Sequence, residues 1–318
     1  MTGVDRDPNI VDAGHGIHVV DTGYMRPRLA ASHIVIEGDR AAIVDTGAAP
    51  AARDILAALG TLGIAREQVE YLLLTHVHLD HAGGAGQLMA ALPNARAVLH
   101  PRGAPHLVDP TKLIAGSIEV YGEQKFRELY GEILPLPADR VLTVQDKERI
   151  RLGRRTFEFL DTPGHARHHY CAVDLDHRVI FSGDTFGVSY REFDTAAGPF
   201  VFPTTTPVQF DPQALHASID RLLTYRPERI ALTHYGPVGD IERLAADLHE
   251  CIDEFVRIAR RHAAAPQRPA RIAADMYRFL DERLDRHGFA GDDARRHELL
   301  DSDVDLNTQG LDVWLRKV

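Results

Sequence analysis

A short histidine-rich segment is the strongest chemical signal in the chain. His76, His78, Asp80 and His81 fall within six residues, in the run Thr-His-Val-His-Leu-Asp-His-Ala-Gly-Gly that begins at Thr75. The preceding Tyr-Leu-Leu-Leu predicts a buried strand, so the first two histidines should project from the same side as that strand ends. A Gly-Gly pair then opens a helical stretch, so Asp80 and His81 are expected on a turn. Such a turn could aim both side chains at a second ion.

Ligand chemistry alone does not fix the metal, because zinc, ferrous iron and manganese all accept imidazole and carboxylate. Chance clustering is the alternative explanation, since the chain contains 18 histidines. An isolated histidine is more often a satisfied core residue than a ligand. Four ligand-type residues at this spacing after a buried strand nevertheless favour half of a two-metal site.

Three later segments each end a strand-like run with a ligand-type residue. They are Thr-Pro-Gly-His ending at His165, Ser-Gly-Asp ending at Asp184, and Leu-Thr-His ending at His234. Taken alone, each is explained as a turn glycine or loop beside an incidental polar residue. Their repeated placement at strand ends favours a shared site.

The candidate ligands suffice for two ions, each with an open position. We expect His76, His78 and His165 on one ion, Asp80, His81 and His234 on the other, and Asp184 as the bridge. Two ions about 3.5–4 Å apart can share a hydroxide that is positioned for attack, so no serine or cysteine nucleophile is needed.

Composition places the chain among ordinary globular proteins. It has 318 residues, of which 44% are hydrophobic, and a formal charge of -10 that argues against nucleic-acid binding. The N-terminal residues lack the pattern of a signal peptide and no run is long enough to span a membrane, so a cytoplasmic protein is expected. The two cysteines, Cys171 and Cys251, are too few for a disulfide framework and are expected to be reduced.

Strands and helices alternate along much of the chain. A strand meander is predicted over residues 15–45, and helices over 50–59, 84–92 and 211–223. A polar helical stretch over 111–131 interrupts this pattern. Beyond residue 238 the chain is predicted to be helical and charged, with a helix over 272–287 and then a polar tail.

The order His-x-His-x-Asp-His, Thr-Pro-Gly-His, Gly-Asp and Thr-His resembles that of the metallo-β-lactamase superfamily over roughly residues 16–236. This resemblance implies an α/β fold, an αββα sandwich with a binuclear site where strand-end loops meet. We therefore predict a metallo-β-lactamase domain over 1–238, with a helical insertion at about 104–131, and a helical C-terminal extension over 239–318.

The resemblance also suggests residues that support the site. Asp45, in Ile-Val-Asp-Thr-Gly, matches a position that lies behind the site and orients a histidine. His169 matches a position near the site that is not a ligand, although an ordinary strand residue is an equal alternative. Tyr190, in the loop after Asp184, is a candidate pocket residue.

Residues 200–212 are rigid and apolar and contain Phe202, which we expect to wall the pocket. A proline-rich surface connection is the alternative explanation. The presence of both Asp80 and Asp184 favours the branch with glyoxalase II and the lactonases over the lactamases. The C-terminal helices are expected either to cover the site or to form a homodimer.

The leading hypothesis is a binuclear metal-dependent hydrolase in which a metal-bridging hydroxide attacks a carboxylic ester, thioester or lactone of a small molecule. Asp80 and Asp184 are its catalytic carboxylates, and two divalent ions are its cofactors, with zinc favoured over iron or manganese. The alternatives are a phosphodiesterase with the same ligands, a mononuclear-iron persulfide dioxygenase, and a noncatalytic binding protein. The complete ligand set argues against the last.

Overall fold

The computed structural model describes residues 10–205 and 208–318, which form two compact units. The first unit contains the described residues up to Asp161, with His168–Gly183 and Ile230–Pro237. The second contains Thr162–Arg167, Asp184–Arg229 and Val238–Val318. Because the units alternate along the chain, the predicted domain boundary at residue 238 stays a prediction.

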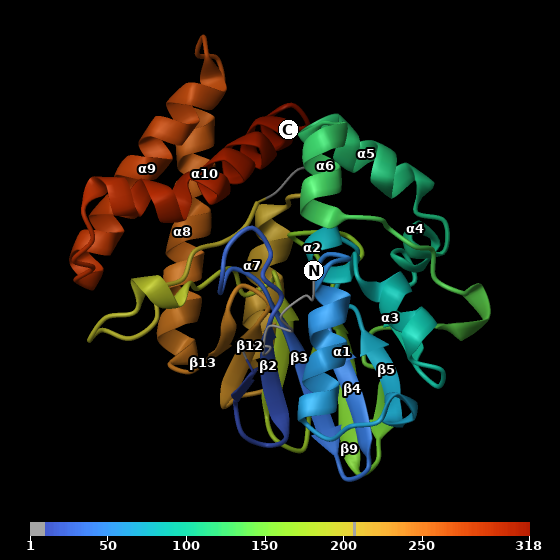
Figure 1. The fold of residues 1–318 in the computed structure, drawn as a ribbon. Coiled ribbons are helices and arrows are strands. Elements are labelled where there is room, and N and C mark those ends of the chain that lie inside the picture. Colours follow the sequence, from blue (N-terminus) through green and yellow to red (C-terminus); the bar gives the residue numbers. More distant parts are fainter. Residues whose placement is uncertain (1–9, 206–207) are drawn as a thin grey trace, which may run out of the picture. The chain divides into compact units, whose positions relative to one another are not determined.

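Seven strands form the first sheet, in the order β1-β2-β3-β4-β5-β6-β7, and β2, β3, β4 and β5 are labelled in Figure 1. They are β1 (Ile10–Asp12), β2 (Ile17–Asp21), β3 (Ala31–Glu37), β4 (Arg40–Val44), β5 (Val69–Leu73), β6 (Arg96–Leu99) and β7 (Val141–Thr143). Neighbours pair antiparallel from β1 to β4 and parallel from β4 to β7. The antiparallel half contains the predicted meander, whereas the parallel half needs crossover connections between its strands.

Six strands form the second sheet, in the order β13-β12-β11-β10-β9-β8. They are β8 (Arg149–Leu152), β9 (Arg155–Asp161), β10 (Tyr170–Asp174), β11 (Val179–Gly183), β12 (Arg229–Leu232) and β13 (Gly236–Val238). Val35 and Leu73 of the first sheet share a buried core with Phe157 and Phe181 of the second. The two sheets therefore pack as a sandwich within the first unit.

Helices in the first unit connect the parallel strands. α1 (Ala51–Thr61) and α3 (Ala85–Ala91) confirm the two predicted helices, and their Ile55 and Leu88 join a second core with the first sheet. The other helical segments are η1 (Arg66–Gln68), α2 (Leu79–Ala82), α4 (Ala104–Val108), α5 (Thr111–Tyr121), α6 (Glu123–Tyr130) and η2 (Ala138–Arg140). The predicted polar stretch over 111–131 is thus helical.

The second unit is mainly helical. Its helical segments are η3 (Arg191–Phe193), α7 (Pro212–Leu223), α8 (Ile241–Arg261), α9 (Arg268–His287) and α10 (Asp293–Leu315). α9 begins earlier than predicted, because Pro269 lies in its first turn, where a missing N–H removes no helical hydrogen bond. In the described part of the chain, no helix has both the length and the apolar character needed to cross a bilayer.

The predicted helical C-terminal extension is confirmed, and its last helix, α10, fills most of the stretch that was predicted only as a polar tail. Asp292 caps this helix by accepting a hydrogen bond from the backbone N–H of Arg295 at 2.9 Å. The buried side of α10 carries Leu300 but also Asn307 and Thr308. Polar residues on a buried face hide the apolar periodicity from which helices are predicted.

Candidate metal centre

The histidine-rich segment follows β5 at the edge of the first sheet. His76 and His78 lie in the loop after the strand, as predicted. Asp80 and His81 lie on the one-turn helix α2 rather than on an open turn, with His78 as its extended N-cap residue. Asp80 and His81 are consecutive residues of this helix, so their side chains point in different directions around its axis.

Three of the predicted ligands converge within the first unit. Asp80 Oδ2 lies 3.6 Å from His81 Nε2 and 3.3 Å from His234 Nε2, and the two nitrogens are 3.3 Å apart. His234 comes from the turn between β12 and β13, so residues distant in sequence meet here. Ligand atoms about 2.0–2.2 Å from a zinc ion lie about 3.3–3.6 Å apart in a tetrahedral site, so the triangle has the size of a metal-ligand set.

Hydrogen bonds fix both imidazoles of this triangle. His81 Nδ1 donates to Asp45 Oδ2 at 2.9 Å, and His234 Nδ1 donates to the backbone oxygen of Leu29 at 2.9 Å. In neutral rings, both Nε2 atoms therefore present lone pairs toward a carboxylate oxygen. Three electron-rich atoms facing one another favour a cation among them, so the donor set fits a divalent metal ion.

Asp45 lies behind the site, fully buried on β4's C-terminal side. Besides His81, its carboxylate accepts hydrogen bonds from the backbone N–H of Thr75 at 2.9 Å and from the hydroxyl of Thr233 at 2.7 Å. It thereby ties the two segments that carry the converging ligands. This is the geometry expected of a residue that orients His81.

His76 and His78 lie beside the triangle in the same unit. His76 Nε2 is 2.9 Å from His78 Nδ1, and the ring centroid of His76 is 4.1 Å from that of His81. His169 is fully buried and stacks on His76 with ring centroids 4.9 Å apart. Its predicted position near the site therefore agrees with the geometry, although its role stays a prediction.

His168 was missed by the sequence analysis. Its ring centroid lies 5.9 Å from that of His78 and 6.2 Å from that of His106 on α4, and it is largely buried. The signal was the adjacent His-His pair at 168–169, of which only the second matched the family pattern. His168 thus lies between the predicted ligand His78 and His106 of the helical insertion.

Two buried tyrosines were also missed as site residues. The hydroxyl of Tyr24 donates to that of Tyr130 at 3.0 Å. Burial raises the pKa of both tyrosines well above the usual value, and the negative charge of Asp80 raises each pKa further. Both phenols therefore stay protonated at neutral pH, within electrostatic reach of Asp80, as hydrogen-bond donors.

The other two predicted ligands meet within the second unit. His165 Nε2 lies 3.3 Å from Asp184 Oδ2, and both residues are buried. Glycine is required before the histidine, because Gly164 has a φ of 133° and a Cβ there would lie 2.4 Å from the backbone of Leu215. The assignment of His165 and Asp184 to an ion with His76 and His78 stays a prediction.

Tyr190 and Phe202 lie in a buried aromatic cluster of the second unit. Their ring centroids are 6.1 Å apart, and Phe202 is fully buried. Their roles in a substrate pocket stay predictions. Thr206 and Pro207, which belong to the same predicted pocket segment, lie outside the described residues.

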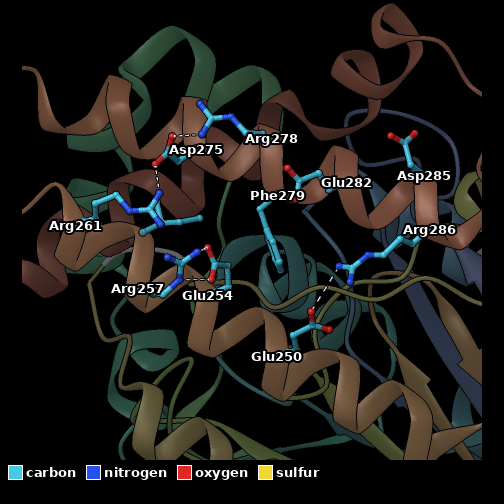
Figure 2. Close-up of a pocket in the computed structure, with 11 residues that line it drawn as sticks. Glu250, Glu254, Arg257, Arg261, Asp275, Arg278, Phe279, Glu282, Asp285 and Arg286 are labelled. Carbon is cyan, nitrogen blue, oxygen red and sulfur yellow. Dashed lines mark hydrogen bonds and ion pairs between the residues drawn. The ribbon is translucent and has the colours of Figure 1, made fainter.

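A surface groove of about 610 Å³ between α8 and α9 contains none of the predicted site residues. Figure 2 shows that most of its charged side chains pair with one another, as Asp275 does with Arg261 and Arg278 and as Glu250 does with Arg286. Ion pairs at exposed positions contribute little individually and leave little unbalanced charge for a ligand. The groove is therefore a weaker candidate than the histidine-rich site.

The sequence was compared with known proteins. ST1585, a metallo-beta-lactamase fold-containing protein from Sulfurisphaera tokodaii, is 25% identical over 229 residues, which are 70% of this chain and 80% of that protein. The crystal structure of ST1585 aligns with a TM-score of 0.67 at 21% identity, covering 96% of this chain and 100% of that one. This likeness shows a shared fold.

Two shorter matches come from other kinds of protein. The type A flavoprotein FprA of Rhodobacter capsulatus is 29% identical over 166 residues, 51% of this chain and 33% of that protein. The human acyl-coenzyme A thioesterase MBLAC2 is 30% identical over 115 residues, 35% of this chain and 39% of that protein. The chain therefore spans well under half of each of these relatives.

The family model of the metallo-beta-lactamase superfamily matches residues 25–234, which include all seven predicted ligands. The matched region contains β3 to β12 and the segments that carry the converging histidines and aspartates. The chain therefore belongs to the metallo-β-lactamase superfamily and has its fold of two mixed sheets with helices.

Proposed function

We propose that this protein is a metal-dependent hydrolase that holds two divalent metal ions and cleaves a carboxylic ester, thioester or lactone of a small molecule. The observation that carries the proposal is the convergence of Asp80 Oδ2, His81 Nε2 and His234 Nε2 within 3.6 Å of one another. Zinc is the first candidate, with iron and manganese as alternatives, because all three accept this donor set.

The chain's own residues would hold and orient the reacting groups. Asp80, His81 and His234 would bind one ion, and His76, His78, His165 and Asp184 are the proposed ligands of the second. When bound, such ions would supply Lewis acidity, which polarises a carbonyl group and lowers the pKa of water. Asp45 would keep His81 in the tautomer whose Nε2 can bind metal.

Asp80 is the candidate for proton transfer. Its side chain is 21% exposed, whereas that of His81 is fully buried, so Asp80 can exchange a proton with solvent or substrate. The neutral hydroxyls of Tyr24 and Tyr130 lie within electrostatic reach of this carboxylate, and because Tyr24 donates to Tyr130, the Tyr130 hydroxyl is the one that could donate to another oxygen. This donor suits a substrate oxygen that gains negative charge during hydrolysis.

The comparisons give this substrate class limited support. One relative is named as an acyl-coenzyme A thioesterase, but the match covers 39% or less of either chain. Phosphodiester hydrolysis uses the same kinds of ligand and is disfavoured by the formal charge of -10, which repels polyanions. The choice among esters, thioesters and lactones therefore needs a direct measurement.

The test is a set of initial rates on metal-loaded protein against a lactone, a thioester, an aryl ester and a phosphodiester, each with and without a chelator. We expect chelator-sensitive turnover of a carbonyl substrate and two ions per chain by elemental analysis. Turnover of the phosphodiester alone would replace the proposed reaction. A single iron per chain with persulfide oxidation would replace the hydrolase.

Two matched variants test the site. His81→Ala should lower kcat/KM at least 100-fold, because it removes a ligand from the triangle. His297→Ala, whose side chain is 50% exposed on α10, should leave kcat/KM within about twofold. Full activity of folded His81→Ala protein would refute the assignment of the site.

A further inference from the structure

The inner face of α10 is polar where it meets two loops of the second unit. Asp303 and Asn307 lie one helical turn apart on this face, and Asn307 is buried. Burying an amide group costs free energy unless the group is hydrogen-bonded. The hydrogen-bond partners of Asn307 therefore show which segment this residue keeps in position.

Asn307 binds residues 203–205 through several hydrogen bonds. Its Oδ1 accepts from the backbone N–H of Thr205 at 2.5 Å and from the Thr205 hydroxyl at 2.9 Å. Its Nδ2 donates to the backbone oxygen of Pro203 at 3.3 Å. The backbone on both sides of Thr204 is therefore fixed by one side chain of α10.

The carbonyl of Thr204 in turn orients His165. His165 Nδ1 donates to this oxygen at 3.3 Å, while His165 Nε2 faces Asp184 Oδ2 at 3.3 Å. Because a carbonyl oxygen can only accept, the contact selects the tautomer that carries hydrogen on Nδ1. The Nε2 lone pair is then available for a metal ion.

Asp303 holds the loop that follows Asp184. The hydroxyl of Tyr190 donates to the carboxylate of Asp303, with distances of 3.1 and 3.0 Å to its two oxygens. Val188 and Phe202 also exchange backbone hydrogen bonds of 2.9 and 3.2 Å, which join this loop to the segment held by Asn307. One face of α10 thus contacts the loops that carry or orient both ligands.

We propose that α10 is a positioning element for His165 and Asp184, and that Asn307 is its main positioning residue. The inference rests on the proposed function in one respect, namely that these two residues bind metal. It gives the last C-terminal helix the role of fixing the loops that carry or orient two proposed metal ligands. Asn307 acts through the Thr204 carbonyl, without touching either ligand.

Asn307→Ala tests the proposal, with Gln309→Ala as the matched control. Gln309 is a second amide on α10, whose side chain bonds Asp305 on the same helix at 2.9 Å. We expect Asn307→Ala to weaken zinc binding by about 10–100-fold in chelator competition, the usual cost of losing a residue that orients a ligand. Gln309→Ala should bind zinc as the wild type does.

A second readout needs neither metal nor substrate. NMR of the metal-free protein should show a hydrogen-bonded, slowly exchanging Nδ1–H of His165 in the wild type and a faster-exchanging Nδ1–H in Asn307→Ala. Asn307→Asp keeps an acceptor for Thr205 and should restore most of the wild-type signal. This measurement separates failure of the positioning role from failure of the proposed hydrolase function.

The two readouts also have outcomes that overturn the proposal. An unchanged exchange rate of the His165 Nδ1–H together with unchanged zinc affinity in Asn307→Ala would assign Asn307 a purely structural role. Equal losses of zinc affinity in Asn307→Ala and Gln309→Ala would attribute the effect to the helix as a whole.

Discussion

Asp45 is a single buried carboxylate that organises the segments around the candidate metal centre. It accepts hydrogen bonds from Thr75 and His81 of the histidine-rich segment and from Thr233, which is distant in sequence. A charged acceptor makes stronger hydrogen bonds than a neutral one, and one carboxylate can serve several donors. Its effect on the site should therefore exceed that of a typical buried polar group.

The substitution Asp45→Asn tests this role. The amide would turn its N–H₂ group toward at least one of the groups that now donate to Asp45. Two facing donors cannot form a hydrogen bond, so His81 should lose its fixed orientation. We expect zinc affinity to fall about 10–100-fold in chelator competition. Asp54→Asn, at a surface carboxylate that pairs with Arg53, should bind zinc like the wild type. Wild-type affinity in folded Asp45→Asn protein would contradict the assigned role.

His33 makes the stability of the fold depend on pH. This β3 residue is buried, and burial lowers its pKa from 6.5 to about 4, although the nearby charge of Asp45 opposes the shift. The folded state therefore binds fewer protons than the unfolded state between these values. Stability is fully present above about pH 6.5 and is lost as pH falls toward 4.

The predicted loss is on the order of 3 kcal/mol across that pH range. Urea denaturation at a series of pH values would measure it, with His33→Gln as the comparison. The variant cannot take up this proton, so its free energy of unfolding should fall less steeply on acidification. Identical pH dependence in the two proteins would show that His33 does not titrate on unfolding.

At the scale of elements, Arg283 joins α9 to its neighbours in the second unit. Its side chain is 6% exposed and bonds Asp247 of α8 at 2.9 Å and Glu250 at 2.5 Å. The guanidinium also lies 5.7 Å from the ring centroid of Phe200. One cation thus contacts a neighbouring helix and the segment that leads to Thr205.

Arg283→Met keeps much of the apolar stem but removes the charge. We expect it to lower the free energy of unfolding by about 2 kcal/mol, less than for a fully buried pair because both carboxylates are partly exposed. Arg278→Met, at a side chain that is 65% exposed, should cost less than about 0.5 kcal/mol. If denaturant titrations gave the same loss of unfolding free energy for both variants, the buried ion pairs of Arg283 would contribute no more to stability than exposed ones.

The helices and strands that could be predicted from the sequence have apolar residues on the face toward the core and polar residues on the face toward solvent. Ile55 and Leu59 mark the buried side of α1 at helical spacing, and α7 ends at Leu223, as predicted for the helix over 211–223. α10 failed this rule because Asn307 and Thr308 lie on its buried side. Its polarity reflects contacts with loops distant in sequence, which no local pattern records.

At the scale of the whole molecule, the same limit applies to the site. The ligand candidates could be predicted because His, Asp and Gly appear in recognisable order at strand ends. The backbone oxygens of Leu29 and Thr204, which orient His234 and His165, could not, because every residue has a carbonyl. Only the folded chain selects which carbonyl accepts from which ring.

Metal binding should therefore stabilise the fold as a whole as well as support chemistry. His81 and His234 are 153 residues apart in sequence, and an ion held by both would link two distant parts of the first unit. A ligand that binds only the folded state at 100 times its Kd adds about 2.7 kcal/mol to the free energy of unfolding. For a chain of 318 residues, whose unfolding entropy is about 2.1 cal/mol/K per residue, Tm should rise by roughly 4 °C.

Differential scanning fluorimetry with and without zinc would measure this shift, and a chelator should reverse it. His81→Ala should lose most of the zinc-dependent increase in Tm, whereas His297→Ala should keep it. The comparison isolates binding at the triangle, because nonspecific zinc binding to surface histidines would raise or lower Tm in both variants alike. An equal zinc-dependent shift in His81→Ala would place the stabilising ion elsewhere and would remove the main support for the proposed hydrolase site.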